Sequence, residues 1–154
     1  MGRCFSAAAA AALMLVSLGA RAEGVEGKRQ FAEFSFTPTA PELTAAKRWG
    51  AEHFAKGKAA GRPVTPVVAR AGATILISLE SVAVCDRVKA CPLLVFRDIT
   101  AKPILKTYAF QNLAVEYREK DTYLILRRWD EVTECKISNT QKALCRKSPP
   151  PKTG

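Results

Sequence analysis

The sequence predicts an α+β fold in which an N-terminal amphipathic helix packs on a meandering antiparallel β-sheet of about five to seven short strands. Three observations predict it. A helical pattern of apolar residues comes first, strand-like runs follow it almost without a break, and four of the five cysteines bracket two turns. The pairs are Cys85 with Cys91 and Cys135 with Cys145, so we expect two hairpin disulfides.

The first 22 residues differ in composition from the rest of the chain. Arg3 is followed by a short apolar core, and small residues end the segment. This order is typical of a secretory signal peptide, which we expect to be cleaved before Glu23. A membrane anchor would need about 20 apolar residues, more than this core supplies. Residues 1–6 also fit a myristoylation motif, which we interpret as a chance match because an export segment follows at once.

The expected mature chain is strongly basic. The full sequence has 24 Lys and Arg and 14 Asp and Glu, and loss of Arg3 and Arg21 leaves 22 basic residues and a net charge of +8. Cys4 also leaves with the signal peptide, so four cysteines remain. An even number in an exported chain indicates two disulfides and an oxidising compartment. We therefore expect a periplasmic or secreted protein with no membrane span after cleavage.

Residues 23–40 are expected to form an extended leader. Phe31, Phe34 and Phe36 interrupt its polar sequence, and we interpret them as packing against the core.

A helix is predicted over residues 41–56, with Gly57 ending it. Pro41 suits the first helical position, and Glu42 lies in the first turn, where the helix dipole favours an acid. Apolar and small residues recur at intervals of three and four positions, which marks one packed face. They are Leu43, Ala46, Gly50 and Phe54.

Strand-like sequence begins near Val67, after a stretch rich in Gly, Ala and Pro. Further strands are expected at residues 74–79, 92–96, 103–110, 113–118, 122–127, 132–137 and 142–145.

The register of one predicted hairpin depends on the length of its loop. With a loop of two residues, Leu124 shares a face with Val115 and Tyr117. With a loop of three residues, Ile125 takes that place, because a shift by one residue swaps the faces of a strand. We prefer the shorter loop, and the alternative stays open.

Four cysteines allow three pairings. Local pairing is favoured because each pair brackets its own turn, and Cys135 and Cys145 are equidistant from Thr140. Geometry rather than energy supports this choice, since the loop-entropy model gives crossed links a comparable stabilisation. We expect one domain over residues 41–147 and a Pro-rich flexible tail over residues 148–154.

The sequence lacks a recognisable catalytic set. His53, the only histidine, lies on the predicted helix, where packing is the simpler interpretation. The spacing of Cys85 and Cys91 differs from that of a thioredoxin-like redox motif. We expect no enzyme, no cofactor and no metal. An alternative is a small envelope enzyme with acidic catalytic residues, for which the acids near the predicted hairpin ends are the candidates: Glu116, Glu119, Asp121, Asp130, Glu131 and Glu134.

Basic residues are the remaining functional signal. The candidate partner contacts are Arg87 and Lys89, between the first cysteine pair, and Arg127 and Arg128 at a strand end. No recognisable nucleic-acid-binding module accompanies them, so specific nucleic-acid binding is not expected. We expect an exported, disulfide-stapled, non-enzymatic interaction module that binds an acidic envelope component or a protein partner.

A helix followed by a sheet whose hairpin tip is a short cystine loop resembles the periplasmic lysozyme inhibitors of the Ivy type. The resemblance covers the order of elements and residues 85–91, and it implies a loop that plugs the cleft of a lysozyme. Residues 86–90 lack the histidine that the family's loop carries. The basic charge of the chain would also repel the basic animal lysozymes. Hydrolase inhibition through this loop is therefore the alternative function.

Overall fold

A computed structural model describes residues 29–88, 90–129, 131–137 and 142–148. The predicted signal peptide, residues 23–28 of the predicted leader, Lys89 and residues 149–154 of the predicted tail lie outside this part of the chain. The described residues form mostly antiparallel β-sheet, with two short helices and two disulfides. In this coarser form the predicted combination of a helical segment, antiparallel strands and disulfides is confirmed.

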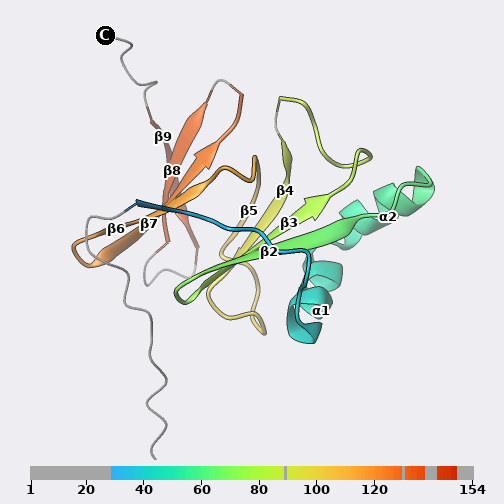
Figure 1. The fold of residues 1–154 in the computed structure, drawn as a ribbon, viewed down its shortest axis with the longest axis horizontal. Coiled ribbons are helices and arrows are strands. Elements are labelled where there is room, and N and C mark those ends of the chain that lie inside the picture. The colour runs from blue at the N-terminus through green and yellow to red at the C-terminus, as the bar shows by residue number, and fades with distance from the viewer. Residues whose placement is uncertain (1–28, 89, 130, 138–141, 149–154) are drawn as a thin grey trace, which may run out of the picture.

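The strands form two sheets, whereas the sequence predicted one (Figure 1). Neighbouring strands are antiparallel throughout. The four-stranded sheet contains, in spatial order, β2 (Thr65–Ala71), β3 (Thr74–Glu80), β4 (Cys91–Phe96) and β5 (Leu105–Ala109). The five-stranded sheet contains β1 (Arg29–Phe31), β6 (Ala114–Arg118), β7 (Asp121–Arg127), β8 (Val132–Lys136) and β9 (Leu144–Ser148).

Two helices, α1 (Ala40–Trp49) and α2 (Ala51–Ala59), replace the single helix that the sequence predicted. Gly50 separates them. A Cβ atom at Gly50 would lie 2.5 Å from Cδ1 of Leu79 and 2.8 Å from the carbonyl oxygen of Ala46. Glycine therefore permits a close approach of the helices to β3 that any side chain would obstruct.

The start of α1 is fixed by a buried carboxylate. Glu42 Oε2 accepts hydrogen bonds from the backbone N and the hydroxyl of Thr39, at 2.7 and 2.8 Å. Glu42 Oε1 accepts a third from Nε of Arg70 at 2.8 Å. Burial raises the pKa of Glu42, but the bonds from Arg70 and Thr39 outweigh burial and lower this pKa overall. The same carboxylate thus caps α1 and ties it to β2.

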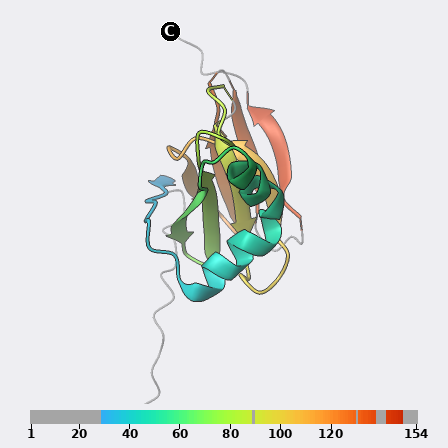
Figure 2. The same ribbon diagram turned by 90° about the vertical axis from the view of Figure 1, so that its right-hand side faces the viewer.

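Two buried clusters hold the layers together. The cluster between the two sheets includes Leu76, Val95, Leu113, Leu124 and Cys135. The cluster between the helices and the opposite face of the four-stranded sheet includes Ala46, Val68, Ile77, Leu94 and Phe96. Figure 1 shows the resulting order from left to right as five-stranded sheet, four-stranded sheet and helices, and Figure 2 looks onto the helices. Burial of each large apolar side chain contributes about 1.5–3 kcal/mol, so both interfaces stabilise the fold.

The phenylalanines of the predicted leader do not behave alike. Phe34 packs against the cluster between the sheets, as predicted. The prediction was wrong for Phe31 and Phe36, which are 64% and 71% exposed. Phe31 belongs to β1 and pairs with Ala114 on the outward face of the five-stranded sheet, because side chains alternate along a strand.

The hairpin of β6 and β7 has the register that the sequence favoured. Arg118 pairs with Asp121, which leaves a turn of two residues, and Val115 pairs with Leu124. Val115 and Leu124 are fully buried on the inner face. Glu119, in the turn, has φ of 51°, a left-handed backbone conformation. The preference for the shorter loop is confirmed.

Both disulfides have the local pairing that the sequence favoured. One joins Cys85 to Cys91 across the connection between β3 and β4. The other joins Cys135 to Cys145, which lie directly opposite each other on β8 and β9. Disulfides of this kind are typical of an oxidising compartment. Among the described residues, no helix combines the length and the apolar character that a membrane span requires.

Candidate partner-binding surface

Two turns that are far apart in the sequence lie side by side at one end of the molecule. The first is the cystine loop closed by Cys85 and Cys91, and the second follows β7. The backbone N of Trp129 donates a hydrogen bond to the carbonyl oxygen of Val88 at 3.3 Å, which joins them. Both turns lie at the top of Figure 1 and Figure 2. We call residues 85–88, 90–91 and 127–129 the loop end.

The cystine loop is held by its own backbone. Asp86 and Ala90 exchange two backbone hydrogen bonds, of 2.9 and 2.8 Å. Oδ1 of Asp86 accepts another from the backbone N of Val88 at 2.7 Å, an arrangement common in tight turns. Ala90 closes the loop with φ of 70°. Together with the disulfide, these contacts fix where Arg87 and Val88 are presented.

Arg128 anchors the second turn to the rest of the molecule. Its Nε donates to the carbonyl oxygen of Tyr108 at 3.0 Å, and its Nη2 donates to the hydroxyl of Thr107 at 2.9 Å. Its backbone N donates to the carbonyl oxygen of Glu131 at 2.9 Å. These bonds turn the guanidinium group of Arg128 toward β5. They leave the next residue, Trp129, 81% exposed.

The four predicted partner contacts have different environments. Arg87 and Arg127 are exposed, and their guanidinium groups have no hydrogen-bond or ion-pair partner among the described residues. Arg128 is half-buried and engaged as described above. Lys89 lies outside the described residues. The fold thus brings Arg87 and Arg127 to the same end of the molecule, although they are 40 positions apart in the sequence.

Trp129 and Val88 are part of this surface, and the sequence reasoning overlooked them. Val88 is 53% exposed, and Trp129 is the most exposed aromatic residue of the described chain. A signal was present, because Trp129 interrupts a run of charged residues at a turn where an apolar side chain has little to pack against.

A carboxylate contacts the disulfide of the cystine loop. Glu80 Oε2 lies 2.9 Å from Sγ of Cys91 and 3.8 Å from Sγ of Cys85. Glu80 Oε1 accepts hydrogen bonds from the hydroxyl of Ser78 and from Nε2 of Gln111, the latter at 3.0 Å. The carboxylate and the two sulfur atoms lie within 4.8 Å of one another, a spacing that could suit a metal ion. Cys85 and Cys91 are joined in a disulfide, however, and a cysteine sulfur binds a metal ion such as zinc as a free thiolate.

His53, the only histidine of the sequence, is packed on α2. Its Nε2 lies 3.5 Å from Oε1 of Glu52, and its ring meets Tyr108 edge-on at 6.1 Å between centroids. Burial is the main cause of a lowered pKa for His53, and the cations Lys106 and Lys56 act in the same direction, whereas Glu52 opposes them. The neutral imidazole is therefore favoured.

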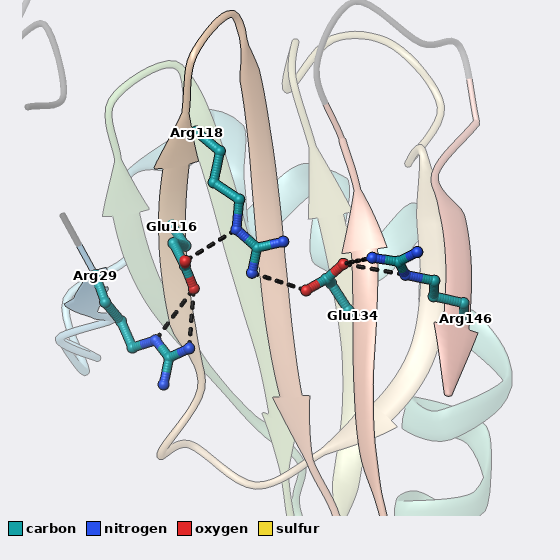
Figure 3. A network of polar contacts seen from close by, with 5 residues as sticks. All are labelled: Arg29, Glu116, Arg118, Glu134 and Arg146. Atoms are coloured by element: carbon teal, nitrogen blue, oxygen red, sulfur yellow. Dashed lines mark hydrogen bonds and ion pairs between the residues drawn. The ribbon is translucent and has the colours of Figure 1, made fainter. Parts of the chain in front are cut away.

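Glutamate and arginine side chains alternate in a row on the outward face of the five-stranded sheet (Figure 3). Glu116 binds Arg29 at 2.9 Å and Arg118 at 2.9 Å. Arg118 reaches over the ring of Tyr123 to Glu134 at 2.8 Å. Glu134 in turn binds Arg146 on β9 at 2.7 Å. These ion pairs link β1, β6, β8 and β9, so they give both carboxylates a structural role.

The cations around Glu116 and Glu134 determine how these groups titrate. Hydrogen bonds from Arg118, and then from Arg29, lower the pKa of Glu116 to about 2. Arg118 is also the main cause of a lowered pKa for Glu134, with Arg146 contributing. Both carboxylates are therefore charged at neutral pH, in the form that binds arginine.

Comparison with known proteins identified no relative. No family model matches the chain, and neither the curated proteins nor the solved structures gave a match.

Proposed function

We propose that this protein is an exported, non-enzymatic interaction module that binds an anionic partner of the cell envelope through its loop end. The observation that carries the proposal is the exposure of Trp129, at 81%, next to Val88 and at the same end as Arg87 and Arg127, which have no partner in the described part of the chain. Aromatic residues and arginine are the residue types most enriched where proteins bind their partners.

The electrostatics of the chain support an anionic partner. The expected mature chain has a net charge of +8, after loss of Arg3 and Arg21 from a total of +10. Such a charge attracts anions over a distance of about 10 Å at moderate salt. Arg87 and Arg127 add directed donors, because a planar guanidinium group binds carboxylate and phosphate with two parallel hydrogen bonds. The Ivy-type alternative uses the same cystine loop but gives no role to Trp129.

The proposal is tested by retention on a dextran sulfate matrix. The double variant Arg87→Gln/Arg127→Gln should elute at lower salt than the wild-type chain, within a gradient from about 0.05 to 0.5 M, because screening shortens with salt. The matched control is Lys102→Gln/Lys120→Gln, which removes the same charge from two exposed residues of other connections.

The control separates a local site from a general effect of charge. If the two double variants elute together, net charge alone determines retention and the loop end is not the binding surface. Retention that does not depend on salt would contradict an anionic partner.

A further inference from the structure

The loop end has the composition of a surface that meets a lipid bilayer. Trp129 and Val88 are exposed, adjacent and held outward by backbone hydrogen bonds. Tryptophan is enriched at the boundary between lipid headgroups and acyl chains, where its ring is buried and its N–H stays hydrated. An exposed Trp–Val pair on a fixed turn matches this boundary.

Two arginines accompany this apolar pair in the sequence. Arg87 precedes Val88, and Arg127 lies two residues before Trp129. Neither guanidinium group has a partner among the described residues. Each basic residue near an anionic bilayer contributes about 1 kcal/mol of attraction. The guanidinium group also fits the phosphate of a lipid headgroup.

The described acids of the loop end are already engaged. Oδ1 of Asp86 accepts the backbone hydrogen bond of Val88. Glu131, beside the second turn, binds Lys147 at 2.9 Å and accepts a hydrogen bond from the hydroxyl of Thr133 at 2.8 Å. Glu131 also lies 3.6 Å from Arg128. Within the described residues, no acid engages Arg87 or Arg127, which leaves both for an external anion.

The small size of the apolar pair favours a bilayer over a protein partner. A stable protein interface covers about 800 Å² on each side, far more than two side chains on adjacent turns. Docking on a bilayer needs only a few inserted side chains together with electrostatic attraction. The disulfide and the backbone bonds of the cystine loop also reduce the entropy lost on docking.

We infer that the loop end docks on an anionic lipid bilayer, with Trp129 and Val88 at the headgroup boundary and Arg87 and Arg127 on lipid phosphates. This inference rests on the proposed function, because it names the anionic partner of the same surface. It requires no membrane-spanning helix.

The experiment uses the disulfide-bonded chain from Glu23 onward, so that the apolar residues 1–22 cannot anchor it. Every helix and strand of the structure begins at Arg29 or later, so this chain retains them all. Binding is measured by co-sedimentation with phosphatidylcholine vesicles that contain about 30 mol% phosphatidylglycerol, and with phosphatidylcholine vesicles alone. Circular dichroism spectra that match the wild-type spectrum show that each variant folds.

We expect binding to the anionic vesicles. Arg87→Gln/Arg127→Gln should weaken it about 25-fold, since two interactions of about 1 kcal/mol correspond to about fivefold each. Trp129→Ala should also weaken vesicle binding. Lys102→Gln/Lys120→Gln removes as much charge as the double arginine variant, but it should change vesicle binding less than about threefold, because long-range attraction is screened.

Trp129 also supplies a spectroscopic readout. The chain has two tryptophans, so Trp49→Phe leaves Trp129 as the single emitter. Its emission should shift to shorter wavelength with anionic vesicles and should not shift with dextran sulfate, because only a bilayer takes the ring out of water. An unshifted emission in the presence of bound vesicles would overturn the inference.

The remaining outcomes separate the two proposals. Salt-dependent retention on dextran sulfate without vesicle binding would leave the proposed function standing and overturn the lipid partner, in favour of an anionic polymer or an acidic protein. Equal vesicle binding by the two double variants would overturn docking through the loop end. A chain that binds neither probe would contradict both proposals.

Discussion

At the scale of single residues, neighbours in the sequence can have opposite roles. Arg127 and Arg128 are indistinguishable as a basic pair, yet Arg127 projects into solvent and Arg128 bonds to Tyr108 and Thr107. The partners of Arg128 lie on β5, about 20 positions earlier in the chain. A sequence pattern records charge but not the direction of a side chain, so only the fold separates the two residues.

The acid stability of the protein should depend on Glu116. Hydrogen bonds from Arg118 and Arg29 lower its pKa from 4.5 to about 2. A carboxyl whose folded-state pKa is lowered stabilises the protein above its ordinary pKa, and this contribution is lost as the pH falls toward the lowered value. Glu116→Gln should therefore reduce the free energy of unfolding at pH 7 on the order of 1–2 kcal/mol, after allowance for solvent screening.

Urea unfolding from pH 7 down to about pH 2 measures this effect. The difference between the wild type and Glu116→Gln should shrink as the pH falls from 4.5 to about 2. The control is Glu33→Gln, which replaces an exposed glutamate without an ion pair in the described part of the chain. A difference that stays constant with pH would show that Glu116 does not act through its charge.

At the scale of elements, local patterns predicted the features that local contacts determine and missed a feature that depends on a distant strand. The period-two alternation around Val115 predicted the correct face of β6 and β7, because one buried face fixes the register. The cysteines were paired correctly because each pair brackets a turn. The break between α1 and α2 was missed, because Gly50 fits the spacing of the packed face and its close contact with Leu79 depends on β3.

Gly50→Ala should destabilise the protein by about 1–3 kcal/mol, the usual effect of extra volume in a packed interior. The added Cβ would lie 2.5 Å from Cδ1 of Leu79 and 2.8 Å from the backbone oxygen of Ala46, so the Leu79 side chain and the backbone of α1 would have to shift. Urea unfolding of the variant gives the change in the free energy of unfolding.

Gly61→Ala provides the comparison for this prediction. No atom lies within 4 Å of an added Cβ there, but Gly61 has φ of +63°. The free energy of unfolding of this variant should fall by only about 1 kcal/mol, because alanine must adopt the left-handed backbone conformation there. A smaller loss for Gly50→Ala than for Gly61→Ala would contradict the tight contact between the helices and the sheet.

At the scale of the whole molecule, the sequence could predict strands but not their division into two sheets. A meander pairs neighbours in order, and β5 and β6 are neighbours that belong to different sheets. The chain changes sheets between Ala109 and Ala114, where the backbone N of Phe110 donates to the carbonyl oxygen of Arg127. The loop end has the same non-local origin, since it joins a turn after β3 to a turn after β7. Its Trp129 could be noticed in the sequence, but its neighbours could not.

The two disulfides should have separable effects on stability and binding. Cys135 is fully buried between the sheets, whereas Cys85 and Cys91 close the loop that presents Arg87. Cys135→Ala/Cys145→Ala should lower the free energy of unfolding by about 2–3 kcal/mol, by the loop-entropy model, and leave binding by the folded protein unchanged. The second variant, Cys85→Ala/Cys91→Ala, should weaken binding because its loop must be ordered on contact.

Urea unfolding and retention on dextran sulfate, applied to both variants under conditions in which they are folded, give the two readouts. Without its disulfide, the cystine loop no longer holds Arg87 and Val88 in one position. The core between the sheets stays intact, because Cys85 and Cys91 are not part of that cluster. The Cys135 and Cys145 variant should show the reverse pattern. If the chain without the Cys85–Cys91 link binds as tightly as the wild type, a fixed cystine loop is not needed for the contact, and binding must depend on the turn that carries Trp129.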